Sequence, residues 1–82
     1  MYITTPEQLA VAVRRARREQ NMTQKRISDL VGVKQATVSA FENHPEATQI
    51  ETLFKILSAL ELHLIVEPRN QPHNASGWTE EW

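Results

Sequence analysis

The chain contains no cysteine, only two glycines and no long apolar run. Without cysteine it forms no disulfide and no thiolate zinc site, and the three scattered histidines do not replace those ligands. Two glycines are too few for a phosphate-cradling loop. No segment approaches the roughly 18 apolar residues of a membrane span, and the N-terminus lacks a secretory signal pattern. We therefore expect a cytoplasmic protein without metal, cofactor, membrane or small-molecule partner.

The 82 residues are enough for one small domain and too few for two. A domain of this size buries only about 60% of the surface that its unfolded chain exposes. Because no disulfide or structural zinc site is available, a second subunit is the favoured stabiliser. The sequence therefore predicts an oligomer.

Charge is distributed unevenly along the chain. Residues 1–40 carry seven Lys and Arg against three Asp and Glu, a net charge of +4, whereas residues 41–82 have a net charge of −5. A basic half can face phosphates while an acidic half faces protein or solvent.

A first helix is predicted from Pro6 to about Gln20. Thr5 can cap its free N–H groups, Gln8 can reach back, and Pro6 loses no hydrogen bond at the first position. Asn21 suits the left-handed position at the helix end. We interpret three arginines of this helix as a solvated face: Arg14, Arg15 and Arg18.

Two short helices follow. Thr23 starts the first, which runs to Val31 and should turn three residues inward, and Gly32 stops it. The second runs from Gln35 to about Glu42, because Pro45 prevents it from continuing. The expected inward residues of the first are Ile27, Leu30 and Val31.

A fourth helix is predicted from the capping-box pattern Thr48-Gln49-Ile50-Glu51. It has the strongest amphipathic pattern of the chain. Ile56 widens its apolar stripe beyond what one small core requires. The stripe comprises Ile50, Leu53, Phe54, Leu57 and Leu60.

The alternation of Leu62, Leu64 and Val66 then predicts one strand. A lone strand leaves its backbone groups unpaired, so its expected partner is the same strand of a second subunit. Residues 68–82 contain no Leu, Ile, Val, Phe or Met and are predicted to be a disordered tail. The folded domain should therefore comprise residues 1–67.

The arrangement of two short helices joined at Gly32 is typical of a helix-turn-helix. Residues 13–60 resemble the family that includes phage repressors and Cro proteins. Thr23-Gln24 matches its second-helix start, Gly32-Val33 its turn, and Gln35-Ala36-Thr37-Val38-Ser39 its recognition helix. The resemblance implies a mainly α fold of four or five helices, and it implies that Arg17 pairs with Glu42.

Nearly the whole chain resembles the HipB-type antitoxins, the DNA-binding partners of HipA-type kinase toxins. The resemblance rests on residues 5–9, 35–39, 41–43 and 54–57, on the following strand, and on the polar tail ending in Glu81-Trp82. Such proteins are dimers that repress their own operon and bind the toxin. The implied partners are thus a second copy, double-stranded operator DNA and a HipA-like kinase.

The start of the recognition helix is the expected base-reading element. If Val38 and Phe41 face the core, helical geometry directs Ala36 and Ser39 outward, with Gln35 at the end that enters the major groove. Glutamine can pair with adenine, lysine can donate to guanine, and a small side chain can contact a thymine methyl. The alternative is a plain solvated helix face. The predicted base-reading residues are Lys34, Gln35, Ala36, Thr37 and Ser39.

The start of the second helix is the expected phosphate site. The resemblance implies that Gln24 touches phosphate and braces Gln35. Thr23 and the first N–H groups of the helix can hold a phosphate oxygen, although Thr23 is also a plain N-cap. The predicted phosphate contacts are Thr23, Gln24, Lys25 and Arg26.

Trp78 and Trp82 lie in the acidic tail. Because tryptophan is a preferred anchor in partner pockets, we predict that they dock the toxin or a protease. The alternative is that they cover the surface of the chain's own domain.

We predict no catalytic residue, because the serine-hydrolase, Walker and zinc-protease motifs are all absent. The predicted function is an operator-binding antitoxin and autorepressor. Two alternatives remain: a free-standing phage-type repressor, and a protein-interaction module that neutralises a toxin without reading DNA.

Overall fold

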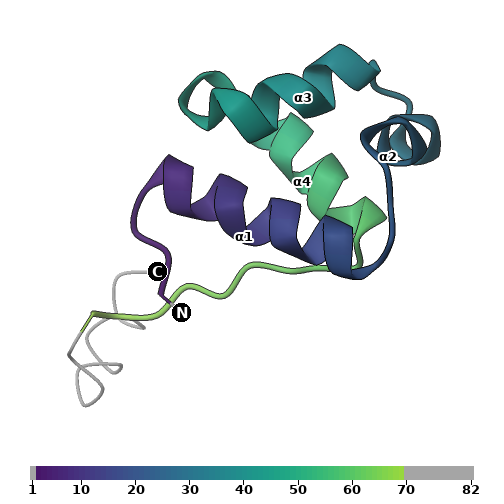
Figure 1. The fold of residues 1–82 in the computed structure, drawn as a ribbon. Coiled ribbons are helices and arrows are strands. Elements are labelled where there is room, and N and C mark those ends of the chain that lie inside the picture. The colour runs from purple at the N-terminus through teal and green to yellow at the C-terminus, as the bar shows by residue number, and fades with distance from the viewer. Residues whose placement is uncertain (1, 70–82) are drawn as a thin grey trace.

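The computed structural model describes residues 2–69, which form four α-helices and one 3₁₀ turn (Figure 1). The mainly helical fold predicted from the sequence is confirmed. Figure 1 shows α2 at one side of the molecule, where it packs against α3 and α4, while α1 packs against α3. No helix in this part of the chain is long and apolar enough to cross a membrane. The elements are α1 (Pro6–Glu19), α2 (Gln24–Val31), α3 (Gln35–Asn43), η1 (Pro45–Ala47) and α4 (Ile50–Ala59).

The ends of α1 follow the local sequence signals closely. The Thr5 hydroxyl accepts a hydrogen bond from the Gln8 backbone N–H at 3.1 Å. The Gln8 side chain reaches back one residue further than a capping box requires and accepts from the Thr4 N–H at 2.6 Å. Asn21 ends the helix with a φ of 57°, the left-handed conformation predicted for it.

The second helix starts and ends as predicted, but one of its expected core residues is exposed. The Thr23 hydroxyl accepts from the Arg26 N–H at 3.0 Å, and Gly32 adopts a φ of 74° at the C-cap. Ile27 is fully buried, whereas Leu30 is 49% exposed. The prediction of an inward Leu30 was wrong, because a helix of eight residues packs on α3 and α4 through one narrow stripe.

The start of α4 lies one residue later than the capping-box pattern predicts. Thr48 closes the 3₁₀ turn, its N–H donating to the Pro45 carbonyl at 3.1 Å, so Gln49 becomes the N-cap. The apolar residues of α4 that lie outside the core are also not the one predicted. Ile56 is buried at 1% exposure, whereas Ile50 and Phe54 are 71% and 51% exposed.

The hydrophobic core is built by residues from all four helices and by the residue after α4. Ala10 and Val13 of α1 pack with buried side chains of the other helices. These residues bring the inner faces of α1 and α3 together, which fixes the direction in which the outer face of α3 points. The largest fully buried side chains are Phe41, Ile27, Ile56, Leu60 and Val38.

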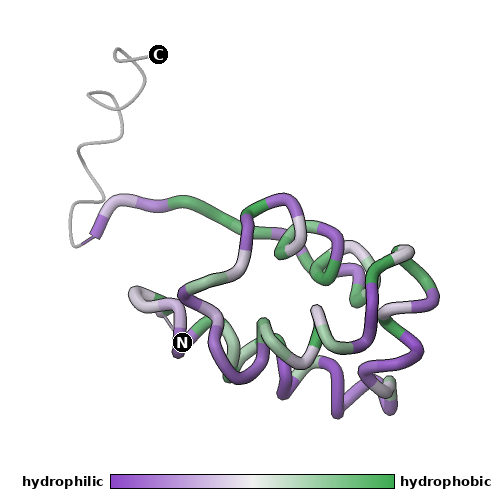
Figure 2. Tube along the Cα trace, turned by 90° about the horizontal axis from the view of Figure 1, so that it is seen from above, coloured by the Kyte–Doolittle hydropathy of each residue, from purple (hydrophilic) through white to green (hydrophobic). Residues whose placement is uncertain are grey.

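Residues 61–69 leave the core as an extended segment that forms no strand in the single described chain. Leu62 packs against the core, whereas Ile65 and Val66 are 72% and 84% exposed. Figure 2 shows this apolar stretch extending away from the helices. A strand needs a hydrogen-bonding partner, and none lies beside it within residues 2–69, so the predicted intersubunit strand remains a prediction.

The exit of this segment is held by two contacts at the end of α4. Glu61 adopts a φ of 57°, and its N–H donates to the Ser58 carbonyl at 3.0 Å. The Gln20 side-chain amide donates to the Leu60 carbonyl at 2.9 Å, which ties the end of α1 to the end of α4. These contacts fix the position and direction of the backbone where the extended segment begins.

Candidate nucleic-acid interface

The turn between α2 and α3 is set by one glycine and one extended lysine. The N–H groups of Gly32 and Val33 both donate to the Ser28 carbonyl, at 2.9 and 3.2 Å. Lys34 then takes an extended conformation, with φ −75° and ψ 149°, and its carbonyl accepts from the Thr37 N–H at 2.9 Å. This sharp change of direction holds α3 across α2 as in a helix-turn-helix.

The two faces of α3 have distinct roles. Val38 and Phe41 are buried at 0% and 1% exposure. The five predicted base-reading residues therefore lie along the start and the outward side of the helix, with two of them half-buried. Exposed are Lys34, Gln35 and Ala36, and half-buried are Thr37 and Ser39.

The small side chains of α3 leave a shallow hollow toward the start of α4. Alanine side chains at this position allow a ligand to come close to the helix backbone. The hollow includes two of the predicted base-reading residues, Ala36 and Thr37. Its lining residues from the two helices include Ala36, Thr37, Ala40 and Thr52.

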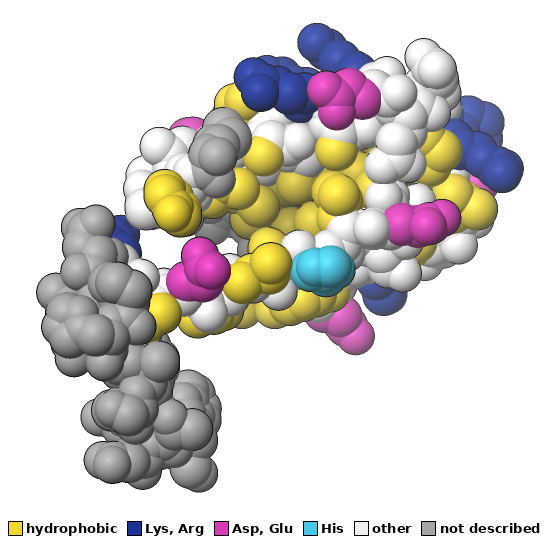
Figure 3. Space-filling model, turned by 90° about the horizontal axis from the view of Figure 1, so that it is seen from below, with side chains coloured by type: hydrophobic (Ala, Val, Ile, Leu, Met, Phe, Trp, Pro, Cys, Tyr) yellow, Lys and Arg dark blue, Asp and Glu magenta, His cyan; other side chains and the backbone are white. Residues whose placement is uncertain are grey.

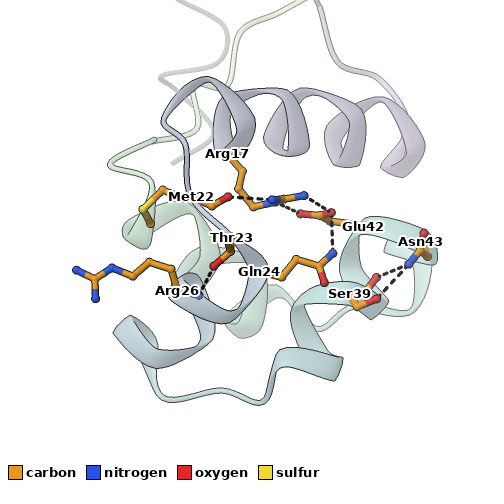
Figure 4. A network of polar contacts seen from close by, with 8 residues as sticks. All are labelled: Arg17, Met22, Thr23, Gln24, Arg26, Ser39, Glu42 and Asn43. Atoms are coloured by element: carbon orange, nitrogen blue, oxygen red, sulfur yellow. Dashed lines mark hydrogen bonds and ion pairs between the residues drawn. The ribbon is translucent and has the colours of Figure 1, made fainter.

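A network of charged hydrogen bonds joins α1 to α2 and α3 (Figure 4). Arg17 Nε lies 2.7 Å from Glu42 Oε2, and Arg17 Nη2 lies 3.1 Å from Glu42 Oε1. Arg17 Nη1 also donates to the Met22 carbonyl at 2.9 Å. The Arg17 and Glu42 side chains are only 12% and 4% exposed, so this pair ties the recognition helix to α1.

Gln24 has a different contact from the one that the resemblance implied. Its Nε2 donates to Glu42 Oε1 at 3.0 Å, and within the described residues it makes no hydrogen bond to Gln35. The brace therefore acts on the end of α3 rather than on its start, because Glu42 is fixed by Arg17 within reach of Gln24. Spacing along the sequence gave no sign of this contact.

The other predicted phosphate residues surround the start of α2. Thr23, Lys25 and Arg26 are all exposed. The Lys25 ammonium lies 3.4 Å from the Asp29 carboxylate, but both side chains are more than half exposed, so this pair is weak.

Asn43 was missed by the sequence analysis. Its side-chain amide donates to the Ser39 carbonyl at 3.0 Å and to the Ser39 hydroxyl at 3.2 Å (Figure 4). The four-residue spacing on one helix face was the signal that could have found it. This contact fixes the Ser39 hydroxyl, which belongs to the predicted base-reading residues.

Two groups of predicted site residues make no site within residues 2–69. Leu62, Leu64 and Val66 lie in the extended segment without a strand partner in this single chain. Trp78 and Trp82, like most of the predicted tail, lie outside the described residues. No group of His, Asp or Glu side chains in the described part could hold a metal ion.

Comparisons with known proteins also indicate a helix-turn-helix, and they cover most of the chain. Residues 13–65 match the HTH_3 family, described as helix-turn-helix. The chain is 40% identical to Antitoxin HipB of Escherichia coli O6:H1 (strain CFT073) over 82 residues, which cover 98% of this chain and 87% of that protein. The chain belongs to the HipB antitoxin family. A second HipB, from Escherichia coli (strain K12), is 39% identical and covered over 93% of its length.

Solved structures of HipB proteins share the fold. A chain of the HipA-HipB-O2-O3 complex superposes with a TM-score of 0.84 and 40% identity, covering 85% of this chain and 99% of that one. A chain of the HipB-O4 20mer complex gives a TM-score of 0.83, with the same identity and coverage.

Proposed function

We propose that this protein is an operator-binding antitoxin that represses its own operon and binds a HipA-like kinase. The observation that carries the proposal is the exposed start of α3 after the Gly32 turn, with Lys34 and Gln35 free to enter a major groove. Two relatives that are 40% and 39% identical to this chain are antitoxins. Chains with a similar structure come from a HipA-HipB-O2-O3 complex and a HipB-O4 20mer complex. Binding to an operator places the protein in the cytoplasm.

In this proposal, α3 reads bases and the start of α2 holds the phosphate backbone. Gln35 pairs with adenine, Lys34 donates to guanine, and the small outward side chains of α3 let the helix approach closely. Thr23, with the first N–H groups of α2, receives a phosphate oxygen, and Lys25 adds positive charge. Further predicted contacts are Gln24 and Arg26 to phosphate and Ala36, Thr37 and Ser39 to bases.

We further propose that two copies pair through Leu62, Leu64 and Val66. Two observations support the pairing: residues 65 and 66 are mostly exposed although apolar, and the segment has no backbone partner among residues 2–69. Figure 3 shows apolar side chains exposed between α1 and this segment, where a second segment could lie. A two-fold pairing sets the two recognition helices one DNA turn apart, about 34 Å, and requires an inverted-repeat operator.

The tail completes the proposal. Trp78 and Trp82 anchor the kinase or a protease, because two large aromatic side chains in an acidic segment match the chemistry of binding hot spots. Residues 1–67 then form the DNA-binding and dimerisation domain, and residues 68–82 the docking tail.

Operator binding is tested with DNA from the region upstream of the protein's own gene. We expect affinity for an inverted repeat that exceeds affinity for scrambled DNA by about 10³-fold or more and falls steeply with salt. A single half-site serves as the matched control and should bind much more weakly. Equal affinity for all three DNAs would leave only the protein-interaction alternative.

The kinase partner is tested by affinity purification of the tagged full-length protein from its host, with mass spectrometry of its companions. An equimolar kinase-like protein is the expected result. Recovery of the homodimer alone, still bound to operator DNA, would instead favour a free-standing repressor.

A further inference from the structure

The outer face of α1 carries three arginines in a cluster beside Glu19. Within residues 2–69, no carboxylate comes within ion-pair distance of them, in contrast to Arg17. Together with Val11 and Glu19 they line a shallow hollow, and Val11 itself is 39% exposed. Figure 3 shows one group of Lys and Arg side chains at the top edge of the molecule, with an Asp or Glu side chain beside it. The three residues are Arg14, Arg15 and Arg18.

Operator DNA does not account for this arginine face. Ala10 and Val13 are buried on the side of α1 that packs against the inner side of α3, roughly opposite Arg15 and Arg18. The exposed side of α3, with Ala36 and Ala40, points away from α1. Because residues three apart share one side of a helix, Arg15 and Arg18 lie together on the exposed side of α1, away from the predicted base-reading residues, and Arg14 lies at its half-buried edge.

The acidic tail has the complementary chemistry. Residues 70–82 contain Glu80 and Glu81, no Lys or Arg, and both tryptophans of the chain. Carboxylates pair with guanidinium groups in a two-pronged geometry, and the face of an indole ring stacks on them. The exposed Val11 offers an apolar contact for one of the rings.

The tail is long compared with α1. Glu80 follows Arg69 by eleven residues, which span up to about 36 Å when extended. The described part of the molecule measures 42 Å in its longest direction, and the 14 residues of α1 extend over about 21 Å. A tether of this length also keeps the tail at a high effective concentration near α1.

We propose that residues 70–82 dock on the arginine face of α1, with Glu80 and Glu81 paired to Arg14, Arg15 and Arg18 and with Trp78 and Trp82 stacked beside them. The docked tail covers the two tryptophans in the free protein. A kinase or protease that binds them must then compete with α1, so the arginine face regulates access to the tail.

Tryptophan fluorescence of the full-length protein alone tests the contact, because both tryptophans lie in the tail. A tail docked for half of the time lowers the acrylamide quenching constant about twofold below that of a free peptide of residues 70–82. Replacing all three arginines with glutamate (R14E, R15E, R18E) should restore the peptide value. The matched control reverses three charges on the DNA side and should leave quenching unchanged (K25E, R26E, K34E).

Two further variants keep the test decisive. E80Q with E81Q alters only the tail and should also release the tryptophans, even if the α1 variant fails to fold. E80R with E81R should restore protection in the α1 variant. A wild-type quenching constant equal to that of the peptide, or an equal change in both charge-reversed proteins, would overturn the proposal. Neither result bears on operator or kinase binding, since the protein is measured alone.

Discussion

Arg17 and Glu42 face each other in a two-pronged ion pair, 2.7 Å between Nε and Oε2 and 3.1 Å between Nη2 and Oε1. Glu42 also accepts a hydrogen bond from Gln24, so one carboxylate joins three helices. The recognition helix is therefore oriented by a polar contact as well as by its apolar side.

Breaking this pair should destabilise the protein strongly. E42Q leaves the Arg17 charge nearly buried without its counter-charge, and we expect a loss of about 3–5 kcal/mol in the free energy of unfolding. Urea unfolding followed by circular dichroism measures it. The double variant R17M with E42L removes both charges and should be more stable than E42Q. If the losses of R17M alone and E42L alone simply add up to the loss of the double variant, the pair is not coupled and the interpretation fails.

Base reading and phosphate binding should separate by mutation. Q35A should cost about 1–3 kcal/mol on the operator and little on random DNA, because only a base contact is lost. K25A should weaken both and reduce the slope of log affinity against log salt by about 1. Fluorescence anisotropy at several salt concentrations measures these effects. R15A, on the far side of the molecule, is the control and should leave the salt slope unchanged.

The proposed pairing of residues 62–66 predicts a monomer when a charge is placed there. Val66 is 84% exposed in one chain, so V66D should not alter the fold of the monomer. In the dimer each copy loses roughly 1.5 kcal/mol of valine burial and gains a desolvated carboxylate. Analytical ultracentrifugation measures the dissociation, with V66T as the isosteric control. A V66D protein that remains fully dimeric would place the interface elsewhere.

The turn between α2 and α3 predicts a purely conformational effect at Gly32. A Cβ added there meets no atom within 4 Å, but the φ of 74° is unfavourable for a side chain. G32A should therefore cost about 1–2 kcal/mol without any steric clash. Thermal unfolding should show a decrease in Tm of several degrees, and G32N, which tolerates this conformation better, should lose less. Wild-type stability of G32A would contradict this account.

Local signals predicted the helices well because caps and stops act within a few residues. Thr5, Thr23, Asn21 and Gly32 do in the structure what their side chains or backbones favour. The prediction that Thr48 caps α4 was wrong because its N–H closes the 3₁₀ turn before the helix. No short motif indicates which of the two turns forms.

Burial was predicted less well than helix position. Leu30, Ile50 and Phe54 have the spacing of core residues and are nevertheless exposed. The periodicity of a helix shows which residues share a face, but it does not show how wide a stripe its neighbours cover. The Gln24 contact with Glu42 escaped for a similar reason: the two residues are 18 apart in sequence, and only the packing of α2 on α3 brings them together.

The left-handed backbone of Glu61 has a consequence for the operator. This residue fixes the direction in which the extended segment leaves α4, and the bond from Gln20 to Leu60 holds the turn against α1. In a dimer joined by these segments, Glu61 connects the paired segments to the helix-turn-helix of each copy. The backbone angle at Glu61, set far from any base contact, then determines the number of base pairs between the two half-sites.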